Sequence, residues 1–332
     1  MQGRNTECHR KERSALLRAA GALVFVLLSS ARVPAQSRPA QITDEIGRSV
    51  EVRTEVRRIV SLAPNLTEIV FAMGEGDRLV GDTTFCDYPA EATQKTHVGG
   101  PINPNLEQIA ALAPDLILAT KAINRRETVD ALARLGLPVY VTDPHSVEDM
   151  ISSIEHLGGV LHAESSAAPL AKELRARLSE LDRVLAGVVP RRVFFVVWRM
   201  PLISVGRGSF IADALRRAGA RSVVEAAADW PQVSLEQVVL LEPEFLVFSS
   251  AHAAESRQEI EDLRALPGWR DLDALRRGNA IVLSDAINRP APRLVDAIEQ
   301  LARALHQDVF ATRGRPPGDV ARAAEEVCPC AP

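Results

Sequence analysis

A short segment occurs twice in this chain, each time just before an apolar run. The first copy begins at Asn105 and reads NLEQI, and the second begins at Ser234 and reads SLEQV. The copies are 129 residues apart, which is too far for a solenoid repeat and close to the length of one domain. The repeat therefore predicts two similar lobes that each carry one glutamate, Glu107 or Glu236, at the same place.

The first 35 residues have the pattern of a secretory signal. Basic residues precede an apolar run over 19–28, and the small residues that end at Ala35 resemble a cleavage site. The run is shorter than the roughly 20 residues that cross a membrane, so we expect an exported, soluble protein cleaved near Ala35. A retained signal anchor is the alternative. Without residues 1–35, the formal net charge changes from −4 to −8, which argues against binding to nucleic acid or to anionic lipid.

Strand-like and helix-like segments alternate through both halves of the remaining chain. This alternation predicts an α/β fold with two mainly parallel-sheet lobes and a ligand cleft between them. The expected strands of the first lobe are 58–62, 79–81, 116–119 and 139–141, and those of the second are 193–198, 223–224, 245–248 and 280–283.

A leucine-rich segment between the lobes has the spacing of an amphipathic helix. We expect it to be a stiff helical connection, and the alternative is an ordinary last helix of the first lobe. The expected organisation is then a signal peptide at 1–35, an N-terminal α/β lobe at 57–164, a bridging helix at 165–187, a C-terminal α/β lobe at 190–310 and a flexible tail at 313–332.

The repeated segment has the features of a helix start. Asn105 and Ser234 suit the N-cap position, and a glutamine three residues later completes a capping-box pattern in each copy. Glu107 and Glu236 fall in the first helical turn and are expected to face solvent. They can complement the helix dipole, which is worth about 0.3–1 kcal/mol each. Their matched positions in two lobes favour a second role, the presentation of two equivalent charges to a partner.

Four aromatic residues and one arginine fall in loops near predicted strand ends: Phe85, Tyr88, Trp198, Trp230 and Arg289. Ligands of open α/β sheets collect at strand ends, so these side chains are candidates to line a shared cleft. Each aromatic residue could instead belong to a core. Arg289 could meet the polar rim of a ligand or remain solvated.

Catalytic and metal-binding motifs are missing from the sequence. It contains no nucleophile elbow, no phosphate-binding glycine loop and no zinc-protease motif, and its histidines are scattered. Cys86, Cys328 and Cys330 define no disulfide framework. We therefore expect no catalytic residue, no metal site and no intrinsic cofactor.

Five segments resemble, in order, the helical-backbone class of ABC-transporter substrate-binding proteins, and most closely those that bind cobalamin. The segments are RIVSLAPNLTE from Arg58, DYP from Asp87, the first repeat and the apolar run after it, WPQVSLE from Trp230 and RPAPR from Arg289. The similarity extends over roughly residues 57–306. In place of a tryptophan before the first repeat helix, this chain has Gly100-Pro101-Ile102.

The resemblance implies a periplasmic monomer that delivers a small molecule to an ABC importer, whose permease dimer lies in the inner membrane. It implies that Glu107 and Glu236 dock onto permease arginines and that cobalamin or a related corrinoid is the transported ligand. Haem, a ferric siderophore or another metal chelate is the alternative within the class. A secreted two-lobed enzyme and a direct metal-ion receptor are alternatives from other classes, disfavoured by the missing catalytic groups and the scattered histidines.

Overall fold

The computed structural model of the protein describes residues 40–250 and 253–313. The expected signal peptide at 1–35, Cys328 and Cys330 lie outside the described residues, as does the expected tail from residue 314 onward. No helix of the described part is long and apolar enough to cross a membrane.

The N-terminal lobe is built on a five-stranded sheet in which every pair of neighbours is parallel. Its strand order is β5-β4-β3-β6-β7, with the first strand of the lobe in the middle. Parallel neighbours require crossover connections, and the helices between the strands supply them. The strands are β3 (Ile59–Ser61), β4 (Leu79–Asp82), β5 (Thr96–His97), β6 (Leu116–Thr120) and β7 (Val139–Thr142).

Four helices and a hairpin complete this lobe. The helices are α2 (Pro64–Ala72), α3 (Leu106–Ala111), α4 (Arg126–Arg134) and α5 (Val147–Leu161), with short 3-10 turns η1 (Gly76–Arg78) and η2 (Ala90–Gln94). The antiparallel hairpin of β1 (Ala40–Thr43) and β2 (Ser49–Val52) lies upstream of residue 57. Arg48 attaches it to the sheet by donating to the carbonyl of Val139.

The C-terminal lobe has a four-stranded parallel sheet in the order β11-β8-β12-β13. Its strands are β8 (Arg191–Val196), β11 (Ala220–Ser222), β12 (Phe245–Ser250) and β13 (Ala280–Ser284), and a small antiparallel hairpin pairs β9 (Trp198–Arg199) with β10 (Leu202–Ile203). Its helices are α7 (Phe210–Arg217), α8 (Leu235–Leu241), α9 (Ala253–Leu263), α10 (Asp273–Arg276), α11 (Arg293–Leu305) and α12 (Gln307–Arg313), with 3-10 turns η3 (Trp269–Asp271) and η4 (Asp285–Asn288).

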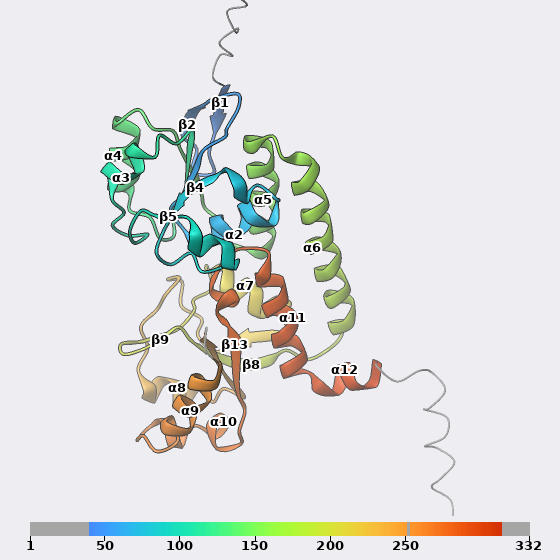
Figure 1. The fold of residues 1–332 in the computed structure, drawn as a ribbon. Coiled ribbons are helices and arrows are strands. Elements are labelled where there is room, and N and C mark those ends of the chain that lie inside the picture. Colours follow the sequence, from blue (N-terminus) through green and yellow to red (C-terminus); the bar gives the residue numbers. More distant parts are fainter. Residues whose placement is uncertain (1–39, 251–252, 314–332) are drawn as a thin grey trace, which may run out of the picture. The chain divides into compact units, whose positions relative to one another are not determined.

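A single long helix joins the two lobes, as the leucine spacing predicts. Helix α6 (Glu164–Leu185) packs along α5 of the first lobe and contacts α7 and α11 of the second (Figure 1). Its buried leucines belong to an apolar core that includes one face of each sheet. Because strand side chains alternate, the opposite faces pack into separate cores, one with Val60 and Ile117 and the other with Phe194 and Leu246. The α/β class, the two parallel sheets and the joining helix are thus confirmed.

One expected strand is displaced. We expect a strand at 223–224, but β11 ends at Ser222. The N–H of Val223 still donates to the Val193 carbonyl of β8 at 2.9 Å, but the N–H of Val224 donates to the Ser222 hydroxyl at 3.2 Å, so the ladder ends there. At the other end of the lobe, α12 reaches Arg313, the first residue of the segment expected to be a tail.

Candidate functional site

The two repeated segments form two equivalent helix starts. Asn105 caps α3 by accepting from the N–H of Gln108 at 3.0 Å, and Ser234 caps α8 by accepting from the N–H of Gln237 at 3.2 Å. The full capping box forms only in the second copy, where the Gln237 side chain accepts from the Ser234 N–H at 2.9 Å. The expected box in the first copy is wrong, because the N–H of Asn105 already donates to the Val98 carbonyl at 2.7 Å.

The equivalence continues to the ends of both helices. Arg58, just before β3, donates to the carbonyl of Leu112 at 2.7 Å, and Arg192, at the start of β8, donates to the carbonyl of Leu241. The next residue in each copy, Ala113 or Glu242, has a left-handed backbone with φ 44°. Proline follows each and prevents the helix from continuing. Each copy of the repeat is therefore a complete helix with a side-chain cap at its start and the same arginine bond at its end.

Glu107 and Glu236 occupy the first turn of these helices and are exposed, as expected. Neither forms an ion pair with any residue that the structure describes. The pKa of Glu236 lies below its usual range because its carboxylate accepts from its own backbone N–H and from Ser234. Both residues can therefore present negative charge to an outside partner.

The four aromatic candidates follow the carboxyl ends of parallel strands in the two lobes. Phe85 and Tyr88 lie in the loop after β4, Trp198 forms β9 directly after β8, and Trp230 follows β11. Their exposed fractions are 61%, 44%, 61% and 45%, which excludes the alternative that they are core residues. Exposed aromatic residues grouped at strand ends are typical of a ligand site.

Close backbone packing holds the Trp230 segment in place. The N–H of Gly206 donates to the Asp229 carbonyl at 2.9 Å, and the N–H of Ser204 donates to the Pro231 carbonyl at 3.0 Å. A Cβ on residue 206 would lie 1.7 Å from the Ala228 carbonyl oxygen, so only glycine permits this approach. Trp230 is therefore presented on a segment bonded on both sides to the chain after β10.

The C-terminal lobe has an open pocket of about 520 Å³ at the ends of β8 and β12. This is the point where the strand order reverses, the usual ligand position in open α/β sheets. Of its lining residues, only Trp198 was predicted from the sequence. The others are mainly apolar, and Phe248 and Trp269 form an aromatic pair with ring centroids 6.5 Å apart. The lining includes Trp198, Met200, Phe248, Leu263, Leu266 and Trp269.

At the corresponding point of the N-terminal lobe, one buried amide connects the loops. The Asn124 side chain donates to the carbonyls of Leu62 and Pro101 at 2.9 and 2.8 Å, and its oxygen accepts from the N–H of Thr120 at 2.7 Å. This amide joins the loops after β3, β5 and β6. In the first lobe, hydrogen bonds of Asn124 therefore hold the loops together at the point where the second lobe has a pocket.

Arg289 belongs to an ion cluster that connects the lobes. It donates to Asp87 at 2.6 Å and to Glu68 at 3.0 Å, and it pairs with Asp285 at 2.8 Å. Arg293 donates to both oxygens of Glu68, at 2.9 and 2.7 Å. Glu68 is buried, so its two guanidinium partners balance a charge that water does not reach.

The charges of this cluster reinforce one another. Hydrogen bonds from Arg289 lower the pKa of Asp87. Burial opposes the charge of Arg289, but hydrogen bonds to Asp87 and Glu68 outweigh it and raise the arginine's pKa. The Arg293 guanidinium lies 3.7 Å from the centre of the Tyr88 ring, a cation–π contact. The cluster therefore also fixes the loop that carries Tyr88.

A second polar cluster lies under the Phe85 loop. Asp82 ends β4, is fully buried and faces the Nδ1 atom of His97 at 2.8 Å. Burial raises the pKa of Asp82 to about 6, although His97 opposes the shift. Cys86 is an unpaired, buried thiol in contact with Thr67 and Thr83, and burial raises its pKa. Within residues 40–250 and 253–313, no cluster of histidine, cysteine and carboxylate side chains could hold a metal ion.

Two lobes with parallel sheets, one joining helix and aromatic residues at both sets of strand ends define a class of binding protein. A family model described as "Periplasmic binding protein" matches residues 59–286. The vitamin B12-binding protein of Vibrio parahaemolyticus serotype O3:K6 is 35% identical over 246 residues, which are 73% of this chain and 87% of that protein. The chain belongs to the periplasmic binding protein family, and it is a non-catalytic component of transport and not an enzyme.

Solved structures agree with this assignment. The periplasmic vitamin B12-binding protein of Vibrio cholerae matches with a TM-score of 0.67 and 29% identity, covering 78% of this chain and 99% of that one. A periplasmic heme-binding protein from Roseiflexus sp. RS-1 in apo form matches with a TM-score of 0.69 and 25% identity, covering 76% and 99%.

Proposed function

We propose that the protein is the substrate-binding protein of an ABC importer and captures cobalamin or a related corrinoid between its lobes. The observation that supports this best is the set of exposed aromatic side chains at the strand ends of both sheets: Phe85, Tyr88, Trp198 and Trp230. A similar protein at 35% identity is described as vitamin B12-binding, which supports the same ligand class.

The chemistry of a corrinoid suits this arrangement. A corrin is a broad macrocycle with two apolar faces and an amide-bearing edge, and aromatic rings bury large apolar areas with few rotatable bonds. In this proposal the macrocycle lies between the aromatic residues of the two lobes. Arg289 acts at the rim, where it holds Asp87 and the neighbouring Tyr88 in position. The site needs no catalytic residue, metal ion or intrinsic cofactor.

Haem or another iron chelate is the second candidate. A structurally similar protein is described as heme-binding, and Tyr88 and Met200 are exposed side chains of the kinds that ligate haem iron. The variant Tyr88→Phe separates the two ligands, because it removes the phenol oxygen and keeps the ring. Haem affinity should fall if Tyr88 is the iron ligand, whereas corrinoid affinity should change little.

Isothermal titration of the exported protein tests the proposal, with cyanocobalamin, haem and a ferric siderophore as separate titrants. We expect one-to-one binding of cyanocobalamin alone, with submicromolar affinity. Binding of haem or the siderophore alone would keep the transport role and replace the ligand. If none of the three titrants binds, the proposed ligand class as a whole is wrong.

We further propose that Glu107 and Glu236 contact arginines of the permease dimer, one lobe on each subunit. Both are exposed, occupy the same turn of equivalent helices and have no ion-pair partner among the described residues. Charge pairs at an interface rim set orientation and association rate more than affinity. Reversing both charges should abolish uptake by a reconstituted importer and leave ligand titration unchanged. Normal uptake by the double variant would make the docking assignment wrong.

The periplasm is the proposed location, with signal cleavage near Ala35, and the working form is a monomer. N-terminal sequencing of the exported protein checks the cleavage position. Light scattering with and without ligand checks the monomer.

A further inference from the structure

The C-terminal lobe has one strand fewer than the N-terminal lobe on one side of its sheet. Strands β4 and β11 have the same place, next to the first strand of their lobes. In the N-terminal lobe β5 pairs with the outer edge of β4, whereas β11 is the last strand of its sheet in the described structure. The flank of α8 therefore lacks the strand that covers the flank of α3.

The end of α3 packs against this part of the sheet. Leu112 joins the apolar cluster of Val98, which follows β5, and Val80 of β4. A Cβ on residue 81 would lie 2.6 Å from the Leu112 Cδ1 atom, so the strand and the helix are already in close contact. Position 112 corresponds to Leu241 in the second copy. Leu241 also packs against the core of its lobe, but among the described residues no strand lies beyond β11 to cover this side of α8.

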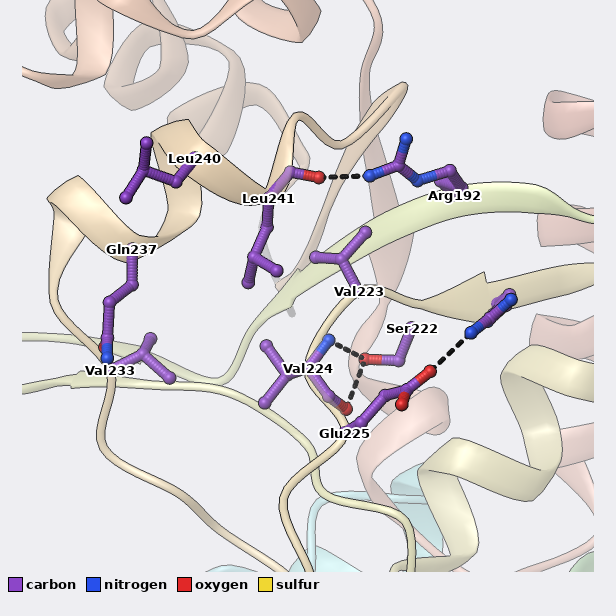
Figure 2. A pocket seen from close by; sticks show the side chains of 10 residues that line it. Arg192, Ser222, Val223, Val224, Glu225, Val233, Gln237, Leu240 and Leu241 are labelled. Carbon is purple, nitrogen blue, oxygen red and sulfur yellow. Dashed lines mark hydrogen bonds and ion pairs between the residues drawn. The ribbon is translucent and has the colours of Figure 1, made fainter.

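A groove of about 690 Å³ occupies the open space beside α8. Figure 2 shows Gln237, Leu240 and Leu241 of α8 on one side and Val223 and Val224 on the other. Leu240, an apolar residue in the last turn of α8, is 83% exposed.

The two arginines at the groove already have partners. Arg192 donates to the Leu241 carbonyl, and Arg221 pairs with Glu225. The groove therefore combines apolar surface from valine and leucine side chains with polar residues, and the charge of Arg221 is already paired. Arg221 also places an exposed charge on the edge strand, a feature that opposes pairing with a second copy of the chain.

Leu240 shares a helix face with Glu236. The two residues are four positions apart, so they lie on one side of α8 about one turn from each other. This face combines a carboxylate with an apolar groove. In the first copy the position that corresponds to Leu240 is Ala111, so α3 presents a carboxylate without a large apolar neighbour.

We propose that the groove beside α8 receives an apolar side chain of the permease, on the same segment as the arginine that meets Glu236. The inference rests on the proposed docking role of Glu236 and extends it. It makes the two lobes unequal partners: the C-terminal lobe contributes a buried apolar contact, and the N-terminal lobe contributes mainly charge.

Binding of the purified protein to its importer complex in nanodiscs tests the groove. Leu240→Asp should weaken binding at least tenfold, and Leu240→Ala should weaken it less. Leu240→Met should bind like the unmodified protein, because Met keeps the apolar volume. Val189→Asp is the matched control, since Val189 is 80% exposed and lies outside the groove and both docking helices. Ligand titration and melting temperature should be unchanged in all four variants, because the substituted side chains are exposed.

The outcomes separate the groove from the docking role on which it rests. If Leu240→Asp binds the importer like the unmodified protein while Glu236→Arg does not, the groove is outside the interface and the docking role stands. If neither variant changes binding, both proposals are wrong. If Leu240→Asp disrupts a dimer seen in light scattering and leaves importer binding intact, the groove belongs to a second copy and the inference is overturned.

Discussion

Each lobe extends a carboxylate to the other lobe from its first helix, but the two contacts differ in kind. Glu68 of α2 binds the side chain of Arg293, the first residue of α11. Asp213 of α7 accepts from the backbone N–H of Val147, the first residue of α5, at 2.9 Å. Helices α5 and α11 both follow the last strand of their sheets. The helix that follows the last strand is therefore contacted in both lobes. The contact is a buried ion pair at α11 and a hydrogen bond from the first backbone N–H at α5.

The difference shows which connection between the lobes is more vulnerable. Glu68 has two guanidinium partners that lose their only buried carboxylate if it is removed, because their other partners, Asp87 and Asp285, are more exposed. Asp213 supplements a helix start that Ser146 already caps. The two equivalent positions are therefore expected to contribute unequally to stability, and the lobes can be compared pair by pair.

The largest effect is expected at these cross-lobe carboxylates. Glu68→Ala should lower the free energy of unfolding by about 3–5 kcal/mol, because it leaves two arginines without their buried partner. Asp213→Ala should lower it by about 1 kcal/mol, the usual value for one capping bond. Chemical denaturation of both variants measures the ratio. Equal losses would show that the two contacts are energetically equivalent.

The next comparison concerns the carboxylates at the start of β6 and β12. Asp115 is buried and accepts from the N–H groups of Arg57 and Arg58, each at 3.0 Å, and from Arg53 at 2.9 Å. The equivalent Glu244 is exposed and accepts from the Arg192 N–H at 3.3 Å. Asp115→Ala should cost about 3 kcal/mol of stability and Glu244→Ala less than about 1 kcal/mol. A larger loss at Glu244 would contradict this order.

A pH effect should arise in the N-terminal lobe from Asp82, whose counterpart at the end of β11 is the non-titrating Ser222. The folded protein holds the Asp82 proton up to about pH 6, whereas the unfolded chain releases it near its ordinary pKa of 3.8. The folded state therefore binds more protons between these values, so the contribution of Asp82 to stability falls as pH rises from about 4 to 6.

Asp82→Asn should remove that slope. Relative to the variant, the unmodified protein should lose about 1–3 kcal/mol of stability between pH 4 and pH 7. Urea denaturation at several pH values gives the difference. Parallel pH profiles for the two proteins would refute the assignment to Asp82.

The aromatic residues of the two lobes should contribute unequally to ligand binding. Trp230→Ala should weaken cyanocobalamin binding by about 2 kcal/mol, and Tyr88→Ala by about 1 kcal/mol, because Arg293 already covers one face of the Tyr88 ring. Leu135→Ala is the control, since Leu135 is an exposed residue at the end of α4. Unchanged affinity in Trp230→Ala would assign Trp230 a structural role only.

The smallest effect should distinguish the two repeat helices. Gln237→Ala removes the second bond of the capping box and should cost about 0.5 kcal/mol. Gln108→Ala should cost almost nothing, because the Asn105 N–H has a backbone partner. Thermal melts of the pair, measured side by side, resolve this difference. A greater loss for Gln108 would show that its side chain has another role.

Local patterns were sufficient to predict much of this fold. The leucine spacing predicted the long helix between the lobes, and the cap residues predicted the starts of α3 and α8. The positions of the four aromatic residues outside periodic segments made them candidates, but the sequence left open whether each belonged to a core. These features depend on a few neighbouring residues, which a single sequence contains.

Long-range contacts could not be predicted in the same way. Glu68 lies in a helix whose pattern resembles any buried helix, and its partner Arg293 is 225 residues away. Trp269 and Phe248 meet only because β12 and η3 come together in the fold. The groove beside α8 exists because a strand is missing from one edge of the sheet, and no residue marks such a difference. Arg289 stood out as a loop charge, but two of its three carboxylate partners, Glu68 and Asp87, are 221 and 202 residues away in the sequence.

The apolar core around α6 has a consequence for how the molecule melts. Because that core includes one face of each sheet, separation of the lobes would expose leucine and phenylalanine surface on both. Neither lobe can then lose its structure alone without a cost to the other. Heating should give one calorimetric transition whose van't Hoff enthalpy equals the measured enthalpy, so that the two lobes behave as one thermodynamic unit.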